Sequence, residues 1–542
     1  MLDPRLDSLQ DYLEAFFGDA DYVLSKASDD ASFRRYFRIE RANTTFIAMD
    51  APPDKENTKA FLHIDKLLRS ANIHAPKIID SDLKNGFLLT EDLGNQTLLQ
   101  AQKDSFDINL YKKAIDVVIQ MQEIQIDLND HIPYDASILN AEMQLLVDWY
   151  LPKDLDIDLK NALNRIFDLL TQNALNQKQV FVHRDYHSRN LMITDDDLGV
   201  IDFQDGVIGP ISYDLVSLLK DAYFELSSDN LNTLLHYYYD KKQLDIGFDV
   251  FEKQFDLMGL QRHLKVLGIF QRLSIRDGKH QYLGDIPLVK KYVLNVADKY
   301  PELSGIKSIL QTADNQMHAM ILAAGRGERM MPLTKNTPKP LIKLNNKPLI
   351  DFAISSLKKA NINNVVINTA YLGEKIHSYL GHGESLDMRI QYSDESSGAL
   401  ETAGGIIKAL PLLGDKPFIV VNSDVVCDYD LKNLKLPMGS LAHLVLIDNP
   451  EHNKNGDFSL INEHQVTTAG HNSYTFSGIG IYHPNFFKAH KSNQGIKLPL
   501  YPLLKEAMVN NQLTGEYYDG AWQDVGTPER LEQAKNQLKL DN

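Results

Sequence analysis

The chain has 542 residues, too many for one ordinary hydrophobic core, so roughly two to four domains are expected. Its residues are 43% hydrophobic and 24% charged, and no run approaches the roughly 18 consecutive apolar residues of a membrane-spanning helix. The net charge of −17 argues against a general nucleic-acid-binding protein, because a phosphate backbone requires a basic protein face.

The single cysteine and the first residues limit the compartment and the kinds of metal site. Cys427 excludes an internal disulfide and a thiolate-rich metal site, and we expect a small buried hydrophobic residue rather than a nucleophile. The first ten residues, MLDPRLDSLQ, contain acids and lack the apolar stretch of a secretory signal. We therefore expect a cytoplasmic protein, with no nucleic acid, no membrane and no obligate protein partner.

The first half contains its strongest motif between Gln179 and Pro210, QVFVHRDYHSRNLMITDDDLGVIDFQDGVIGP. An apolar strand leads into H-R-D, an asparagine follows five residues after the aspartate, and I-D-F follows another strand. In phosphoryl transfer, Asp185 can accept a hydroxyl proton, while Asn190 and Asp202 can hold Mg²⁺ on the nucleotide phosphates. The pattern therefore indicates a kinase active site.

This motif resembles the kinase catalytic core, and HRDYHSRN followed by IDFQD is similar to the aminoglycoside phosphotransferase-like branch. The resemblance covers about residues 20 to 300 and implies an α+β, protein-kinase-like bilobal fold with ATP as co-substrate. It also implies that DASFRRYFRI is a hairpin over the phosphates, where Ser32 faces them and Arg34 and Arg35 are candidate partners. In FLLTEDLG, the backbone groups of Glu91 and Leu93 would hold adenine.

One position departs from the kinase pattern. Kinases carry a lysine on the third strand, but the equivalent strand here, TTFIAMDAPP, has Met49, and Lys55 and Lys59 lie just beyond it. The missing lysine leaves open a pseudokinase that regulates the rest of the chain. His183 and Asp214, the latter in YDLVSLLKDAY, are interpreted as structural supports of the catalytic loop.

A change of pattern separates the two halves. From about Leu231 to Tyr300, apolar residues recur at three- and four-residue spacing, which predicts helices. Polar residues follow, so we place the domains at 1–316 and 317–542, with lobes of about 1–93 and 94–316 in the first. Beyond this boundary NNVVINTA and KPFIVVNSDVV alternate with helical patterns such as PLIDFAISSLKKA, which predicts an α/β domain with a mainly parallel sheet.

The second half begins with a strand, a glycine-rich turn and a basic run, in LAAGRGERMMPLTKNTPKPLIKL. Gly325 and Gly327 can supply the backbone angles of a sharp turn and let main-chain N–H groups reach a phosphate. Arg329 lies just beyond the turn, and two prolines stiffen the backbone around Lys339. Cations held in place in this way suit a triphosphate.

Two carboxylates from distant segments complete a candidate site. Asp424 follows the apolar strand PFIVV, at a strand end where open α/β sheets bind ligands. Asp424 and Asp524 can together hold one Mg²⁺ through oxygen ligands. A sugar phosphate is already an anionic nucleophile, so catalysis would consist of alignment and charge stabilisation, without a general base.

Four motifs in this half, including ETAGG, VVNSD and AWQDVGTPERL, resemble those of sugar-1-phosphate nucleotidyltransferases over about residues 317 to 542. The resemblance implies a Rossmann-like sheet and transfer of a nucleotidyl group with release of pyrophosphate. With NPEHNKNGDF and FSGIG, it points most to the N-acetylmuramate 1-phosphate uridylyltransferase branch. It places the nucleotide and the sugar at Ala323, Ala324, Glu401, Thr402, Ala403, Gly404, Asn422, Asp457 and Gly478.

Together the two halves resemble an anomeric N-acetylmuramate/N-acetylglucosamine kinase joined to that uridylyltransferase, as used in bacterial cell-wall (peptidoglycan) recycling. The implied reactants are the amino sugar, ATP, UTP and Mg²⁺, and the implied product is UDP-N-acetylmuramate. Two alternatives stay open. One is a choline-type kinase joined to a cytidylyltransferase that makes CDP-choline, and the other is the regulatory pseudokinase joined to an active transferase.

Overall fold

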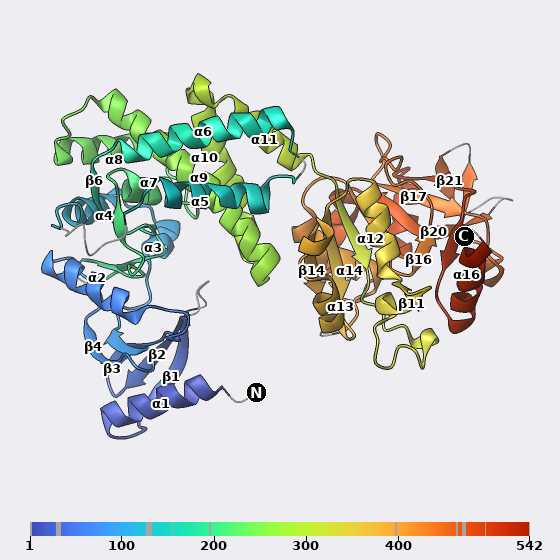
Figure 1. Ribbon diagram of the computed structural model, residues 1–542, viewed down its shortest axis with the longest axis horizontal. Coiled ribbons are helices and arrows are strands. Elements are labelled where there is room, and N and C mark those ends of the chain that lie inside the picture. Colours follow the sequence, from blue (N-terminus) through green and yellow to red (C-terminus); the bar gives the residue numbers. More distant parts are fainter. Residues whose placement is uncertain are drawn as a thin grey trace. The chain divides into compact units, whose positions relative to one another are not determined.

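The computed structural model describes residues 3–28, 34–125, 133–153, 155–194, 197–395, 398–461, 464–468, 473–493 and 495–540. The chain forms two compact units (Figure 1). The first comprises Met1–Phe270 and Gly284–Leu310, and the second comprises Gln271–Leu283 and Gln311–Asn542. The short segment Gln271–Leu283 groups with the second unit, although the predicted boundary near residue 316 places it in the first domain, and that boundary stays a prediction.

The first unit begins with a five-stranded antiparallel sheet in the order β1-β2-β3-β5-β4. Its strands are β1 (Val23–Ser28), β2 (Arg35–Arg41), β3 (Thr44–Asp50), β4 (Ile78–Asp82) and β5 (Phe87–Glu91). Helix α1 (Pro4–Phe17) packs on the face that carries Ala48 and Leu89. Helix α2 (Thr58–Ser70) packs on the face that carries Met49 and Leu88. Neighbouring residues of a strand face opposite sides, so the apolar runs of β3 and β5 supply two cores.

A larger, mainly helical part follows. Its helices are α3 (Leu98–Asp104), α4 (Ile108–Met121), α5 (Ala136–Leu145), α6 (Ile157–Leu175), α7 (Tyr213–Leu219), α8 (Ser228–Lys242), α9 (Phe248–Asp277), α10 (Ile286–Lys299) and α11 (Gly305–Asp314), with π-helical η1 (Leu146–Tyr150) and 3₁₀ turns η2 (His280–Asp285) and η3 (Pro301–Leu303). The helices predicted between Leu231 and Tyr300 are confirmed. Two short antiparallel strand pairs hold the kinase motif, β6 (Gln179–Val182) with β9 (Val207–Pro210) and β7 (Leu191–Ile193) with β8 (Leu198–Val200).

The second unit is built on a nine-stranded sheet in the order β14-β13-β10-β15-β20-β17-β21-β19-β18. The strands are β10 (His318–Leu322), β13 (Asn364–Thr369), β14 (Arg389–Asp394), β15 (Phe418–Asn422), β17 (Ala442–Ile447), β18 (Phe458–Ile461), β19 (Gln465–Thr467), β20 (Ser473–Tyr482) and β21 (Leu513–Tyr517). The expectation of a mainly parallel sheet is wrong for the sheet as a whole. Strands β14, β13, β10 and β15 are parallel, but β20 runs antiparallel to both of its neighbours, β15 and β17.

Helices cover both faces of the parallel strands. Ala319 and Ile321 of β10 pack with α12 (Ile350–Lys359) and α13 (Gly373–Leu380), while Met320 packs with α14 (Glu401–Leu413). This three-layer arrangement confirms the Rossmann-like α/β fold. The remaining elements are α15 (Tyr501–Val509), α16 (Pro528–Leu540), the pairs β11 (Lys343–Leu344) with β12 (Lys347–Pro348) and β16 (Val425–Cys427) with β22 (Trp522–Asp524), and the 3₁₀ turns η4 (Glu328–Met330), η5 (Lys339–Leu341), η6 (Glu384–Leu386), η7 (Glu451–Asn453) and η8 (Pro484–Asn493).

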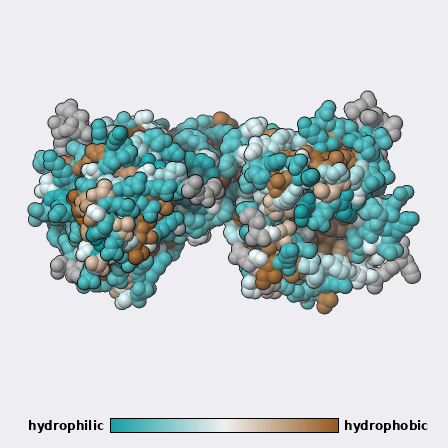
Figure 2. Space-filling view, turned by 90° about the horizontal axis from the view of Figure 1, so that it is seen from below, coloured by the Kyte–Doolittle hydropathy of each residue, from teal (hydrophilic) through white to brown (hydrophobic). Residues whose placement is uncertain are grey.

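Hydrophilic residues cover most of the face seen in Figure 2, and hydrophobic residues form separate groups on it. Within the residues that the structure describes, no helix has the length and apolar character needed to cross a membrane.

Candidate active sites in the two units

The catalytic loop of the first unit runs from β6 to β7 and is held from inside the fold. His183 is fully buried, and its Nε2 lies 3.1 Å from the carbonyl oxygen of Ile201. The backbone N–H of Asp185 donates to Nδ1 of His183 at 3.3 Å. Asp214 accepts hydrogen bonds from the backbone N–H groups of His183 (2.7 Å) and Arg184 (3.1 Å). His183 and Asp214 therefore support the loop, as predicted.

The structure brings two motif residues of this loop, Asp185 and Asn190, together with Asp202, which follows β8. The side-chain amide of Asn190 donates to the carbonyl oxygen of Asp185 at 3.0 Å and to a carboxylate oxygen of Asp202 at 3.4 Å. Asp202 adopts a left-handed backbone conformation (φ 62°) that is rare for residues other than glycine. One amide and one carboxylate side by side fit Mg²⁺, which takes many of its oxygen ligands from phosphates and water. No cluster of three or more His, Cys, Asp or Glu with metal-binding geometry occurs among the described residues.

A buried charged cluster, which sequence reasoning missed, lies beside Asp185. Arg262 of α9 lies 3.7 Å from the Asp185 carboxylate, and it donates to the carbonyl oxygen of Arg184 at 2.8 Å. Lys265, one turn further along α9, donates to Glu142 of α5 at 2.8 Å, and Arg184 donates to the same carboxylate. Burial alone would raise the pKa of Asp185, but the charges of Arg262 and Lys265 outweigh it and hold that pKa well below its ordinary value. The sequence signal that could have revealed this cluster is the presence of charged residues, Arg262 and Lys265, within the otherwise apolar stretch of α9.

Arg34 is a buried cation close to Asp202. Its side chain is 8% exposed, and Nη2 lies 3.7 Å from Asp202 and 3.9 Å from Asp205. Its Nε lies 3.8 Å from Glu56, which precedes α2. Arg34 thus places a positive charge beside a predicted metal-binding carboxylate. The predicted partner Ser32 lies outside the described residues.

The other candidate cations of this region point elsewhere. Arg35, the next residue, pairs with the buried carboxylate of Asp50 and with Asp3, so it is a structural residue of the sheet. Met49 is 2% exposed and belongs to the core, while Lys55 and Lys59 are exposed. Arg35 begins β2, whereas Arg34 is the residue before that strand, and the two side chains contact different carboxylates.

The segment expected to hold adenine follows β5. The backbone N–H of Glu91 already donates to the carbonyl oxygen of Lys77 at 2.8 Å, so Glu91 can offer adenine only its carbonyl oxygen. The N–H of Leu93 has no partner in the described part of the chain. Arg38 of β2 fastens this segment, since it donates to both carboxylate oxygens of Asp92 (2.6 and 2.8 Å). Sequence reasoning did not identify Arg38 or Asp92.

The second unit has a pocket of about 420 Å³ at the carboxyl end of β10. It is open to solvent, and Arg326 and Arg329 at its mouth are exposed. Its lining is formed by Leu322, Ala323, Gly325, Arg326, Gly327, Glu328, Arg329, Lys339, Pro340, Ser423, Asp424 and Gly526. The structure therefore brings the glycine turn, Arg329, Lys339 and Asp424 to one cavity.

The two glycines of the turn have different roles. Gly327 has a φ of 66°, and a Cβ atom there would lie 3.0 Å from side-chain atoms of Lys339 and Thr334. Gly325 has neither a positive φ nor crowding, so the expectation that both glycines are needed for backbone angles is wrong for Gly325. Because Gly325 lines the pocket, its missing side chain leaves space for a ligand.

Each predicted metal-binding carboxylate of this unit is paired with a cation. Lys339 donates to Asp424, and Arg530 of α16 donates to Asp524 at 2.6 Å. Asp424 lies in the turn just before β16, and Asp524, in β22, is paired with the next residue, Val425. Adjacent carboxylates with cationic neighbours fit one Mg²⁺ ion. Arg530 went unassigned, although it stands in the motif AWQDVGTPERL.

The ETAGG segment forms the first turn of α14. Glu401 is exposed with a φ of 63°, whereas Ala403 is fully buried. The N–H of Gly404 donates to the carbonyl oxygen of Leu498 at 3.0 Å, so this donor is occupied within the chain. Among the backbone groups expected to read the base, those of Glu401 and Thr402 lie at the exposed end.

The residues expected near the sugar fall into two places. Gly478 of β20 (φ 80°) lies against Asn422, because a Cβ there would come within 2.5 Å of the Asn422 amide nitrogen. Asp457 instead accepts hydrogen bonds from the backbone N–H of Phe476 (2.9 Å) and from Asn453 (3.1 Å). Its carboxylate thus supports the start of β18.

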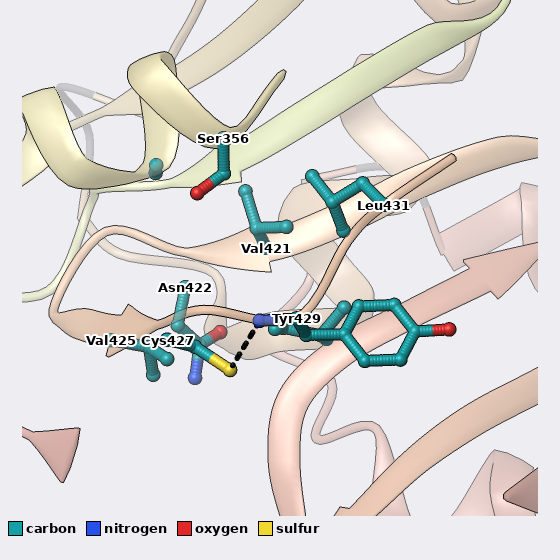
Figure 3. Close-up of a pocket in the computed structure, with 9 residues that line it drawn as sticks. Ser356, Val421, Asn422, Val425, Cys427, Tyr429 and Leu431 are labelled. Atoms are coloured by element: carbon teal, nitrogen blue, oxygen red, sulfur yellow. Dashed lines mark hydrogen bonds between the residues drawn. The ribbon is translucent and has the colours of Figure 1, made fainter. Parts of the chain in front are cut away.

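A small cavity lies behind Asn422, between α12, β15 and β16 (Figure 3). Cys427 lines it, and its Sγ accepts a hydrogen bond from the N–H of Tyr429 at 3.4 Å. Burial raises the pKa of Cys427 to about 11, so it stays a thiol at neutral pH. This agrees with a packing role rather than a nucleophilic one.

Known proteins resemble the two parts separately. The model of the phosphotransferase enzyme family matches residues 23–246, and that of the nucleotidyl transferases matches residues 318–540. An N-acetylmuramate/N-acetylglucosamine kinase of Pseudomonas aeruginosa is 42% identical over 297 residues, which cover 53% of this chain and 87% of that protein.

Neisseria meningitidis has a relative of each part. Its N-acetylmuramate/N-acetylglucosamine kinase is 37% identical over 321 residues, covering 56% of this chain and 95% of that protein. Its N-acetylmuramate alpha-1-phosphate uridylyltransferase is 48% identical over 226 residues, covering 40% of this chain and 97% of that protein. What are two proteins there correspond to two parts of one chain here.

Proposed function

The chain belongs to the phosphotransferase enzyme family in its first part and to the nucleotidyl transferase family in its second, and we propose that it joins two consecutive steps on one amino sugar. The first unit transfers the γ-phosphate of ATP to the anomeric hydroxyl of N-acetylmuramate or N-acetylglucosamine. The second transfers a uridylyl group from UTP to N-acetylmuramate 1-phosphate and releases pyrophosphate. The observation that carries the proposal is that relatives of both parts are named for N-acetylmuramate, as successive steps would require.

In the first unit, Asp185 orients the anomeric hydroxyl and accepts its proton as the oxygen attacks the γ-phosphorus. Its low pKa keeps it ionised at neutral pH, which suits a transition state in which the proton leaves late. Arg34, beside Asp202, offsets negative charge on the phosphates. The carbonyl of Glu91 and the N–H of Leu93 hold the adenine edge.

In the second unit, the N–H groups of Ala324–Gly327 hold the triphosphate, and Lys339 and Arg329 offset the charge that develops on the leaving pyrophosphate. The sugar phosphate attacks the α-phosphorus without a general base, so these residues act by alignment and charge stabilisation. Asn422, beside Gly478, faces the bound nucleotide sugar.

Bound Mg²⁺ would offset phosphate charge in both units. Asn190 and Asp202 would hold it in the first unit, and Asp424 and Asp524 in the second. Asp424 would then exchange part of its present contact with Lys339 for the metal, which leaves Lys339 free to contact phosphate oxygens.

The two alternatives receive no support. The relatives are named for sugars rather than for an aminoalcohol, which does not favour a CDP-choline pathway. The missing lysine had motivated a pseudokinase, but Arg34 places a cation beside Asp202. The cytoplasm stays the predicted location, and peptidoglycan recycling stays the predicted context of the two steps.

Phosphorus NMR of the protein with Mg²⁺, ATP, UTP and N-acetylmuramate tests both steps in one sample. We expect a signal from an anomeric phosphate, followed by the paired diphosphate signals of a UDP-sugar. Asp185→Asn should remove both, and added N-acetylmuramate 1-phosphate should restore the UDP-sugar. Asp424→Asn should instead let the sugar 1-phosphate accumulate.

Asp116→Asn, a surface residue paired with Lys241, is the matched control and should leave both activities unchanged. The proposal fails for the first unit if ATP consumption does not depend on the sugar. It fails for the second unit if the sugar 1-phosphate gives no UDP-sugar. Use of CTP in preference to UTP would instead support the choline-type kinase joined to a cytidylyltransferase.

A further inference from the structure

A buried amide links the glycine loop to the neighbouring strand in the second unit. Asn368, in β13, is 3% exposed. Its Oδ1 accepts a hydrogen bond from the N–H of Ala323, the first residue after β10, at 2.8 Å. Its Nδ2 donates to Oε1 of Glu395 at 2.8 Å. Because an amide oxygen only accepts and an amide nitrogen only donates, these partners define the orientation of the side chain.

Glu395 continues this connection to the other nucleotide segment. It follows β14, is fully buried, and its Oε2 accepts from the N–H of Leu400 at 2.7 Å, immediately before α14. No Lys, Arg or His side chain of the described residues forms an ion pair with this carboxylate. Burying an acid that is satisfied by hydrogen bonds alone is costly, so its place in the fold calls for a specific role.

Helix α14 packs directly on this pair. A Cβ atom at Gly405 would lie 2.7 Å from Oε1 of Glu395 and 2.9 Å from Nδ2 of Asn368. The absence of a side chain at Gly405 is thus required for the helix to approach the pair. The connection Ala323–Asn368–Glu395–Leu400 therefore spans three neighbouring parallel strands, β10, β13 and β14, and ends at the helix.

We propose that Asn368 and Glu395 are positioning residues that set the spacing between the phosphate-holding loop, Ala323–Gly327, and the base-reading segment, Leu400–Gly404. This inference rests on the proposed nucleotidyl transfer in the second unit. A nucleoside triphosphate must contact both segments at once, so its affinity depends on their separation. Neither side chain needs to touch the nucleotide.

The pair allows a test in which two damaging substitutions repair each other. In Glu395→Gln, an NH₂ group replaces one of the two carboxylate oxygens. Either the Asn368 amide or the Leu400 N–H, both donors, then faces another donor and loses its acceptor. In Asn368→Asp, an oxygen faces the oxygen of Glu395. In the double variant, the new amide can donate to the new carboxylate, and the contacts to Ala323 and Leu400 are kept.

Each single variant should raise the KM for UTP by roughly tenfold or more, because a buried polar group without its partner carries a penalty of that size. The kcat should change less, since no group that contacts the reacting atoms is altered. The double variant should return the KM for UTP to within about threefold of the wild type. Gly405→Ala should also raise the KM for UTP, because the added methyl group would push helix α14 away from Asn368 and Glu395.

Asn364→Asp is the matched control. It lies at the other end of β13, where its Nδ2 donates to Gln316 at 2.5 Å, and the KM for UTP should stay unchanged. Folding of the second unit is followed by the fluorescence of Trp522 in a Trp149→Phe background, the chain having two tryptophans. Comparing variants that show the folded signal separates positioning from unfolding.

The proposal is overturned if folded single variants keep the wild-type KM for UTP, or if the double variant is as impaired as the worse single variant. Calorimetric titration of UTP with MgCl₂ gives the same comparison without the transfer reaction. A wild-type protein that binds UTP but transfers it to no sugar phosphate would overturn the proposed function of the second unit, while the four UTP affinities would still decide the role of the pair.

Discussion

Replacing Glu142 by glutamine should destabilise the first unit by about 3 kcal/mol at pH 7. Glu142 is 9% exposed, and it accepts hydrogen bonds from Lys265 and Arg184. Burial alone would raise its pKa, but these two charges lower it to about 2, against an ordinary value of 4.5. Each pKa unit corresponds to about 1.4 kcal/mol, so the folded state favours the charged over the neutral side chain by about 3 kcal/mol. Glutamine has the shape of the neutral acid and loses this stabilisation.

The pH dependence has a definite sign. The pKa of Glu142 is lower in the folded than in the unfolded protein, so its contribution is complete above pH 4.5 and is lost as the pH falls toward 2. The difference in unfolding free energy between the wild type and Glu142→Gln should therefore shrink to about half or less at pH 3.

Denaturant titration in a Trp522→Phe background measures this difference, because Trp149, in η1 shortly after Glu142, is then the remaining tryptophan. Glu123→Gln is the control, since its carboxylate is 67% exposed and its pair with Lys242 should contribute less than about 1 kcal/mol. A loss as small as that of the control, or a loss that is the same at pH 3 as at pH 7, would refute the reasoning.

Three further outcomes are expected. Arg34→Gln should raise the KM for ATP in sugar phosphorylation by roughly tenfold or more, because a charge-assisted contact to phosphate is lost, and unchanged ATP kinetics would contradict its assignment. Lys339→Gln should slow uridylyl transfer by a factor on the order of 10² to 10³ in a steady-state assay while sugar phosphorylation by the same sample is unchanged. Gly478→Ala should lower the unfolding temperature of the second unit more than Gly439→Ala does. The two glycines have similar positive φ angles, 80° and 85°, but only Gly478 lies against another side chain, that of Asn422. Equal losses for the two glycines would mean that backbone strain alone matters.

Features encoded in short segments were predictable. The spacing H-R-D to Asn190 to Asp202 places three residues on one loop and the hairpin that follows it, and the structure brings them together. The glycine turn and Lys339 likewise belong to one stretch and line one pocket. Strands such as β10 and the helices α8 to α10 were predictable because a hydrophobic period is a property of consecutive residues.

Features that depend on which distant segments meet were not predictable. The sequence shows five cations in the basic run but not that Arg530, far beyond it, pairs with Asp524. The antiparallel direction of β20 depends on how the chain returns to the sheet, and the hydrophobic periodicity of the sequence carries no information about strand direction.

By itself the sequence indicated the two families and predicted two sites, the loop after β6 and the glycine turn after β10, because each motif consists of residues close along the chain. The tertiary structure alone decided that Arg34 rather than Arg35 faces Asp202, and that Glu395 joins two loops through Asn368. These contacts depend on the face that a strand turns to its neighbour and on the pairing of segments far apart. Both are set by packing of the whole unit rather than by local preference.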